Sequence, residues 1–278
     1  MTILVTGVRG RVGRAVLEQL LAAGVAVRAA SSRPEGLDLS GGVEGVRFGQ
    51  GAPEALPAAL AGVRKVFLYS ERGGVADFVS AAKEAGVEPV VLLSSFSVES
   101  EHAGTDLIAQ SHLAVEQALS ASGIDWTYLR PGGFATNALQ WSGPIRAARQ
   151  VRLAYPDSYS EPVHELDIAE VAVRALLDDG HRNTAYRLVG PESLSSRQQV
   201  ERIADAIGEP VAVTPISHDE QREELLRFLP GPITDTLLSY QVRRDGVPRE
   251  IEGDVRAVLG RPPRAFAQWA REHAEAFR

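Results

Sequence analysis

Cysteine is absent from this chain of 278 residues, which excludes disulfides, thiolate metal ligands and cysteine nucleophiles. A block of basic residues is also missing and the formal net charge is −7, so binding of nucleic acid is not expected. No apolar run approaches the roughly 18 residues that span a bilayer, and no secretory leader is expected at the N-terminus. These features predict a cytoplasmic globular protein that acts on a small molecule and does not bind a membrane.

The N-terminal residues carry the most informative pattern. The apolar run 2–5 is followed by TGVRGRVG at 6–13, an amphipathic stretch over 14–23 and a second apolar run over 25–30. This order of strand, glycine turn, helix and strand is typical of the first βαβ unit of a dinucleotide-binding fold. The glycines permit a tight turn and let a pyrophosphate approach the N–H groups at the helix N-terminus.

The end of the second predicted strand is where such folds distinguish the two nicotinamide cofactors. An acidic residue there would bind the ribose 2′-hydroxyl of NAD, and the Ser31-Ser32-Arg33 segment has none. Ser32 and Arg33 are suited to the 2′-phosphate of NADP, with Arg11 of the glycine turn as a further cationic group. We expect NADP as the cofactor and NAD as the alternative. The alternative role for Arg33 is that of a solvated loop arginine.

Short apolar runs alternate with helical patterns as far as residue 133. Strands are expected at 46–48, 63–69, 89–93 and 124–129, and helices over 53–61, 75–85 and 107–122. This alternation indicates an α/β fold with a doubly wound parallel sheet and helices on both faces. Ligands bind at the carboxyl ends of such strands, so the residues at the strand ends and just after them should line the cleft. These residues are Tyr69, Ser94, Ser95, Gly132 and Gly133.

The regular alternation ends after about residue 140. We expect a dinucleotide-binding domain over 1–150 and a smaller, mainly helical region over 151–278 that closes the cleft, with residues 165–190 packed back on the sheet. Asp167 is expected to cap one helix of this region and Ser195 another.

A longer motif points to a family. Residues 111–137 read SHLAVEQALSASGIDWTYLRPGGFATN, and this segment resembles the NmrA-like branch of the atypical short-chain dehydrogenase/reductases. The marks are His-x3-Glu on a helix, a Ser-Gly-x3-Thr connection and Leu-Arg-Pro-x2-Phe-x2-Asn. The glycine turn, residues 163–169 and FAQWA at 266–270 agree with it. The resemblance covers nearly the whole chain and implies an NAD(P)-binding Rossmann fold. The family includes quinone-reductase-like bacterial members and cofactor-sensing regulators.

The resemblance also implies where the cofactor lies. The dinucleotide phosphates are expected at Gly7, Gly10, Arg11, Val12 and Gly13. The nicotinamide end is expected at Tyr69, Ser70, Ser95, His112, Gly132, Gly133 and Phe134. The 2′-phosphate is expected near Ser32 and Arg33. Many relatives have a basic residue at the position of Ser32, so Arg33 has to reach from one position later.

The usual catalytic pair of short-chain dehydrogenases is missing at its expected place. That pair is a Tyr and a Lys four residues apart, and the corresponding positions are Ile108 and His112. His112 shares a helical stripe with Val115 and Leu119, so two roles are open: a hydrogen-bonded core or ribose-contacting histidine, and a general acid. No third ligand is spaced for a metal site, and none is expected. Glu116 is expected to pair with a helix neighbour or to hold His112.

Two functions follow from these residues. The first is an NADP-dependent oxidoreductase that transfers hydride to a small quinone, enone or iminium-type acceptor, for which solvent or a nearby side chain can supply any proton. The alternative is a non-catalytic NAD(P)-sensing regulatory protein, which the missing Tyr–Lys pair favours. An isomerase or another dinucleotide-using activity is the third option.

Overall fold

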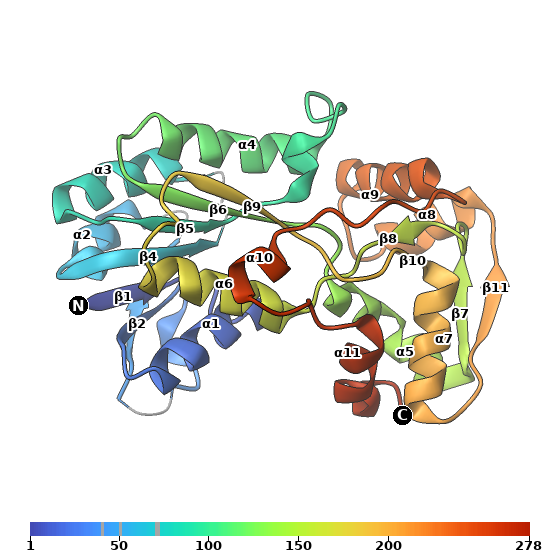
Figure 1. The fold of residues 1–278 in the computed structure, drawn as a ribbon. Helices are drawn as coiled ribbons and strands as arrows, with labels where there is room; N and C mark the ends of the chain where they lie inside the picture. Colours follow the sequence, from blue (N-terminus) through green and yellow to red (C-terminus); the bar gives the residue numbers. More distant parts are fainter. Residues whose placement is uncertain (40–41, 50–51, 70–72) are drawn as a thin grey trace.

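Seven parallel strands form the central sheet. The computed structural model describes residues 1–39, 42–49, 52–69 and 73–278. The strand order is β3-β2-β1-β4-β5-β6-β9, and every neighbouring pair is parallel (Figure 1). The strands are β1 Thr2–Val5, β2 Ala26–Ser31, β3 Glu44–Arg47, β4 Val63–Tyr69, β5 Val90–Leu93, β6 Trp126–Pro131 and β9 Thr184–Leu188. The predicted doubly wound α/β sheet is confirmed.

Helices cover both faces of this sheet. One face carries α1 (Arg11–Ala22) and α6 (Glu165–Leu177), and the other carries α2 (Leu56–Leu60), α3 (Val75–Ala85) and α4 (Leu107–Ser120) (Figure 1). Successive residues of β1 point to opposite faces, so Ile3 joins the core under α1 and Leu4 joins the core under α3 and α4. No helix in the described ranges is long and apolar enough to cross a membrane.

Most of the remaining elements form a smaller part beyond the carboxyl ends of the strands (Figure 1). They are η4 Ala135–Trp141, α5 Ser142–Ala148, β7 Gln150–Leu153, β8 Tyr159–Ser160, β10 Leu194–Ser195, α7 Ser196–Ile207, β11 Ala212–Pro215, α8 His218–Leu226, α9 Gly231–Arg244 and α11 Phe266–Glu272. This part has its own core, in which Trp141, Ile145, Val200, Trp269 and Phe277 pack together. The short helix α10 (Val255–Leu259) packs against α6 instead.

The chain passes between the two parts more than once. Residues 135–148 already contribute to the core of the smaller part. Residues 165–188 then supply α6, which packs on α1, and β9, which pairs with β6. The division into domains 1–150 and 151–278 stays a prediction.

Two predicted helix caps had different outcomes. Ser195 caps α7 as expected, in a capping box with Gln198. The prediction that Asp167 caps α6 is wrong, because α6 begins at Glu165 and His164 is its N-cap. Asp167 is fully buried inside the first turn and accepts a hydrogen bond of 2.7 Å from Arg261 of the C-terminal segment. Its carboxylate therefore fixes that segment against α6.

Candidate functional site

The glycine turn joins β1 to α1 at the carboxyl end of β1. Gly7 has a φ of 67°, a left-handed conformation that favours glycine. A Cβ at Gly7 would lie 3.0 Å from the Cβ of Tyr69, the last residue of β4. Gly13 is more tightly constrained, because a Cβ there would lie 2.4 Å from the carbonyl oxygen of Gly7. The first turn of α1 can approach the loop this closely only with glycine at position 13.

The N-terminus of α1 presents backbone donors. Gly10 is the N-cap and offers no side chain, and the first bond within the helix runs from the N–H of Arg14 to the carbonyl of Gly10 at 3.0 Å. Among the described residues, the N–H groups of Arg11, Val12 and Gly13 have no acceptor. Together with the helix dipole, these groups form a site suited to an anion such as a pyrophosphate.

A cavity of about 320 Å³ lies between this turn and the end of β2. Its lining residues are Thr6, Gly7, Val8, Arg9, Gly10, Ala30, Ser31, Ser32, Phe48 and Tyr69. Arg9 is the cation among them, and none of them is acidic. The cavity therefore adjoins the helix N-terminus and is electrostatically suited to a second anionic group. Its residues and those of the turn fit the phosphate-bearing half of a dinucleotide.

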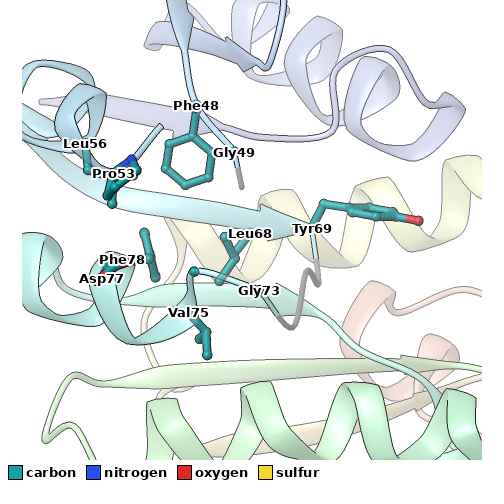
Figure 2. A pocket seen from close by; sticks show the side chains of 11 residues that line it. Phe48, Gly49, Pro53, Leu56, Leu68, Tyr69, Gly73, Val75, Asp77 and Phe78 are labelled. Carbon is teal, nitrogen blue, oxygen red and sulfur yellow. The ribbon is translucent and has the colours of Figure 1, made fainter. Parts of the chain in front are cut away.

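A second, smaller space of about 40 Å³ adjoins the first and shares Phe48 and Tyr69 with it. Its lining is mostly apolar and comes from the end of β3, from α2 and from the start of α3 (Figure 2). The rings of Phe48 and Phe78 meet edge to face, with their centroids 5.9 Å apart. Figure 2 shows the Tyr69 ring pointing away from this space. Tyr69 thus lies beside the glycine turn and Gly7.

Four of the residues expected at the nicotinamide end follow two adjacent strands, β5 and β6. Ser95 follows β5 and caps the short helix η3 (Phe96–Glu99) by accepting a hydrogen bond of 3.2 Å from the N–H of Ser97. Gly132, Gly133 and Phe134 follow β6, which pairs with β5. The fold brings these residues to one edge, and their contact with a cofactor stays a prediction. Ser70 lies outside the described residues.

A partly buried network of charged side chains lies beside this edge. The Glu116 carboxylate accepts hydrogen bonds from the Ser94 hydroxyl at 2.6 Å and from Arg130 at 2.6 and 3.0 Å. Arg130 also donates to Glu99 at 2.8 Å, and Glu99 accepts a bond of 2.6 Å from Arg187 of β9. The network ties η3 to α4, β6 and β9. In the described ranges no group of His, Asp and Glu side chains is arranged to hold a metal ion.

His112 lies one helical turn before Glu116 on α4. Its Nδ1 is buried and has no hydrogen-bond partner among the described residues. Burial lowers the pKa of His112, and the charges of Glu116 and Asp106 oppose this effect only in part. The imidazole is therefore neutral near pH 7. The expectation that Glu116 pairs with a helix neighbour or holds His112 is wrong, because Ser94 and Arg130 occupy the carboxylate.

The smaller part reaches the N-terminus of α4 through Tyr240 of α9. The Tyr240 hydroxyl donates to Asp106 at 2.5 Å, while the same carboxylate caps α4 by accepting the N–H groups of Ile108 and Ala109. Burial and the bond to Asp106 raise the pKa of Tyr240, so it remains a hydrogen-bond donor. Sequence reasoning missed this contact because 134 positions separate the two residues and neither lies in a recognisable motif.

Sequence reasoning also missed Arg9. Its Nε donates to the Ser31 hydroxyl at 3.0 Å at the end of β2. The Arg11 side chain is exposed, and its charge acts on His273 of the C-terminal segment. Arg33 is exposed and bonds to Arg9 through its backbone carbonyl. The available signal was that the glycine turn contains two arginines, either of which could face the end of β2.

Comparison with known proteins matches residues 7–179 to the family described as NAD(P)H-binding. The chain is 39% identical to a (4-alkanoyl-5-oxo-2,5-dihydrofuran-3-yl)methyl phosphate reductase of Streptomyces griseus over 280 residues, which cover 99% of each chain. It is 30% identical to an NAD(P)H azoreductase of Xenophilus azovorans over 81% of this chain and 80% of the relative. Among solved structures, an NADPH-dependent quinone oxidoreductase of Escherichia coli superposes with a TM-score of 0.81 at 25% identity, covering 98% of this chain and 99% of that one.

Proposed function

The chain belongs to the NAD(P)H-binding family, and on that premise we propose that it reduces the carbon–carbon double bond of a small conjugated carbonyl compound. It is an NAD(P)H-dependent oxidoreductase. The observation that carries the proposed acceptor is the 39% identity, over 99% of both chains, with a reductase named for a dihydrofuranone phosphate. The three relatives reported above are named reductases or oxidoreductases, so they do not support the alternative of a non-catalytic sensor.

The chemistry of such an acceptor explains how the chain works without a tyrosine–lysine pair. The relative's name describes a ring double bond conjugated with two carbonyl groups, the ring 5-oxo group and the 4-alkanoyl group. Addition of hydride to the ring carbon that bears the methylene group leaves a carbanion that both carbonyls stabilise. This ion is a far weaker base than the alkoxide formed from an isolated ketone, so water can protonate it. The demand on a catalytic acid is therefore small.

The sequence of α4 is consistent with this chemistry. Residues 107–120 contain neither tyrosine nor lysine, and the positions of the usual pair are Ile108 and His112. A quinone would also accept hydride with little need for a catalytic acid, because its product is a phenolate. We therefore place conjugated lactones and enones first and quinones second. An iminium acceptor is the third class.

His112 is proposed as a neutral hydrogen-bond donor at the acceptor. A buried N–H without a partner is rarer in proteins than an unpaired lone pair, so the unpartnered Nδ1 is assigned the lone pair and Nε2 the proton. An Nε2–H group can donate to the carbonyl oxygen on which negative charge develops. This role differs from that of an imidazolium general acid, which the lowered pKa of His112 disfavours. Contact with the nicotinamide ribose is the alternative role.

The residues proposed to hold the cofactor divide into three groups. The N–H groups of Arg11, Val12 and Gly13 would bind the pyrophosphate. The cavity with Ser32 would receive the adenosine ribose, and Ser95 with the loop at 132–134 would meet the nicotinamide, whose reduced ring supplies the hydride. The basic, carboxylate-free lining of the cavity favours NADPH, with NADH as the alternative.

Steady-state consumption of NADPH tests the proposed acceptor class. The panel contains an alkanoyl dihydrofuranone phosphate, its dephosphorylated alcohol, a benzoquinone, an azo dye, a saturated ketone and a cyclic iminium salt. We expect turnover with the dihydrofuranones, a slower rate with the quinone and none with the ketone. Turnover of the saturated ketone alone would contradict the proposal.

A further inference from the structure

Arg9 is held in a defined position at the end of β2. Its Nε donates to the Ser31 hydroxyl at 3.0 Å, and its Nη2 donates to the backbone carbonyl of Arg33 at 2.5 Å. Ser31 is itself buried, and its oxygen also accepts the N–H of Arg33 at 3.2 Å. A Cβ at Gly36 would lie 2.9 Å from Nη2 of Arg9, so glycine there leaves room for the guanidinium. The glycine turn thus delivers a fixed cation to the last residue of β2.

Most of the hydrogen-bonding capacity of this cation remains available. A guanidinium has five N–H groups, and the two bonds above use two of them. In the described ranges no carboxylate pairs with Arg9, whereas nearby Arg14 and Arg28 are paired with Glu18 and Glu44. Arg9 therefore has three N–H groups left to donate and lines a cavity that has no acidic residue among its described lining residues.

We propose that Arg9 is the main ligand of the 2′-phosphate of NADPH and sets the preference for NADPH over NADH. In this fold the 2′ position of the adenosine ribose lies at the end of the second strand, where Ser31 holds the guanidinium. Arg33 contributes chiefly by fixing Arg9 through its backbone carbonyl. The inference rests on the proposed use of NADPH, but it requires only binding and not turnover.

The two hydrogen bonds that fix Arg9 should increase the affinity for NADPH. An arginine already ordered in the free protein loses little side-chain freedom when the phosphate arrives. Planar N–H pairs also match the oxygens of a phosphate. In NADH the 2′-hydroxyl gives the guanidinium no charge to pair with. Removing Arg9 should therefore weaken NADPH binding selectively.

Titration calorimetry with NADPH and NADH tests the role of Arg9. We expect Arg9→Ala to weaken NADPH binding about 10- to 100-fold, the loss of one or two charge-assisted hydrogen bonds, and to change NADH binding by less than about twofold. Arg14→Ala is the matched control. Arg14 makes contacts of the same kind, to the Glu18 carboxylate at 2.9 Å and the Asp38 carbonyl at 2.7 Å, but lies outside the cavity. It should leave both affinities unchanged.

Two results would overturn the inference. Equal losses of NADPH and NADH affinity in Arg9→Ala would mean that Arg9 has only a structural role. Loss of the preference in Arg33→Ala but not in Arg9→Ala would transfer the role to Arg33. If Arg9→Ala does not fold, Ser31→Ala removes one of the two anchors of the guanidinium together with the bond to the Arg33 N–H, and 2′,5′-ADP and 5′-ADP serve as probes. Ser31→Ala should weaken 2′,5′-ADP several-fold and leave 5′-ADP unaffected, and equal effects would refute the role of Arg9. Absence of turnover with every acceptor would count against the reductase proposal and leave this test intact.

Discussion

Gly13 stands so close to Gly7 that a methyl group on it would lie 2.4 Å from the Gly7 carbonyl oxygen and 2.6 Å from the carbonyl carbon. Both atoms belong to the backbone of the turn, so they cannot move aside without displacing the N–H groups of α1 that are proposed to bind the pyrophosphate. The turn and the first helix are built as one unit. This relationship makes the glycine turn directly testable.

Gly13→Ala should therefore abolish measurable NADPH binding and lower the free energy of unfolding by about 1 to 3 kcal/mol. Gly143→Ala is the control, since Gly143 lies in α5 and a Cβ there meets nothing within 4 Å. It should leave binding intact and stabilise the protein by up to about 1 kcal/mol. Calorimetric titration and urea unfolding measure the two effects. Normal NADPH affinity in Gly13→Ala would show that the turn is not the phosphate site.

Glu116→Gln should lower the free energy of unfolding by about 2 to 3 kcal/mol. The variant leaves the charge of Arg130 partly uncompensated next to the buried side chain at position 116. Glu18→Gln is the control. The Arg14–Glu18 pair is exposed and spans one helical turn, so its loss should cost less than about 0.5 kcal/mol. Urea denaturation compares the two variants. Similar losses of unfolding free energy in the two variants would mean that the network through Glu116 does not stabilise the fold.

The pH dependence of turnover distinguishes the two roles considered for His112. Because burial lowers its pKa, the imidazole is already neutral above the ordinary value of about 6.5, and kcat should stay flat from about pH 7 to 8.5. His112→Leu should lower kcat about 10- to 100-fold by removing a hydrogen-bond donor, and His112→Gln should recover part of the loss. A kcat that falls tenfold per pH unit over this range would instead identify an imidazolium acid.

His273 should make the stability of the fold decrease as the pH rises. Its Nε2 lies 3.1 Å from Glu165 and its Nδ1 lies 3.0 Å from the Trp269 carbonyl, so both nitrogens face acceptors. The hydrogen bond to Glu165 raises the pKa of His273, although burial and the charge of Arg11 oppose the shift. A raised pKa stabilises the fold fully below the unfolded value of about 6.5, and this stabilisation is lost as the pH rises through the folded value.

The melting temperatures of the unaltered chain and of His273→Gln, measured from about pH 5.5 to 8.5, test this sign. The groups facing the ring are Glu165, Arg11 and the neighbouring His164. The difference between the two proteins should be largest at the acid end and narrow toward the alkaline end. A difference that widens with rising pH would contradict the assignment of a protonated His273.

Local patterns made the architecture predictable. The length of each apolar run and the glycines at 7, 10 and 13 report directly on strands and turns, because neighbouring residues decide those features. The sheet, its covering helices and the cap at Ser195 followed from such signals. The cap at Asp167 did not, since an ion pair between the buried Asp167 carboxylate and Arg261 overrides the local preference of aspartate for a helix start.

Contacts between distant segments decide the rest of the site. The bond between Tyr240 and Asp106 depends on how α9 docks on α4, and the engagement of Glu116 by Arg130 depends on the register of β6 under α4. Which arginine of the glycine turn faces β2 depends on the backbone geometry of the turn itself. None of these relationships has a fixed spacing in the sequence. The identities of the residues were informative, but their partners were not.

Transfer of deuterium from NADPH that carries two deuterium atoms on C4 of its nicotinamide ring tests whether the chain reduces the conjugated double bond. The labelled cofactor is incubated with the protein and an alkanoyl dihydrofuranone phosphate, and the product is examined by NMR. We expect one deuterium on the ring carbon that bears the methylene group, and a proton from water on the carbon between the two carbonyls. Tight cofactor binding with no deuterium in the product, or deuterium on a carbonyl carbon, would contradict it.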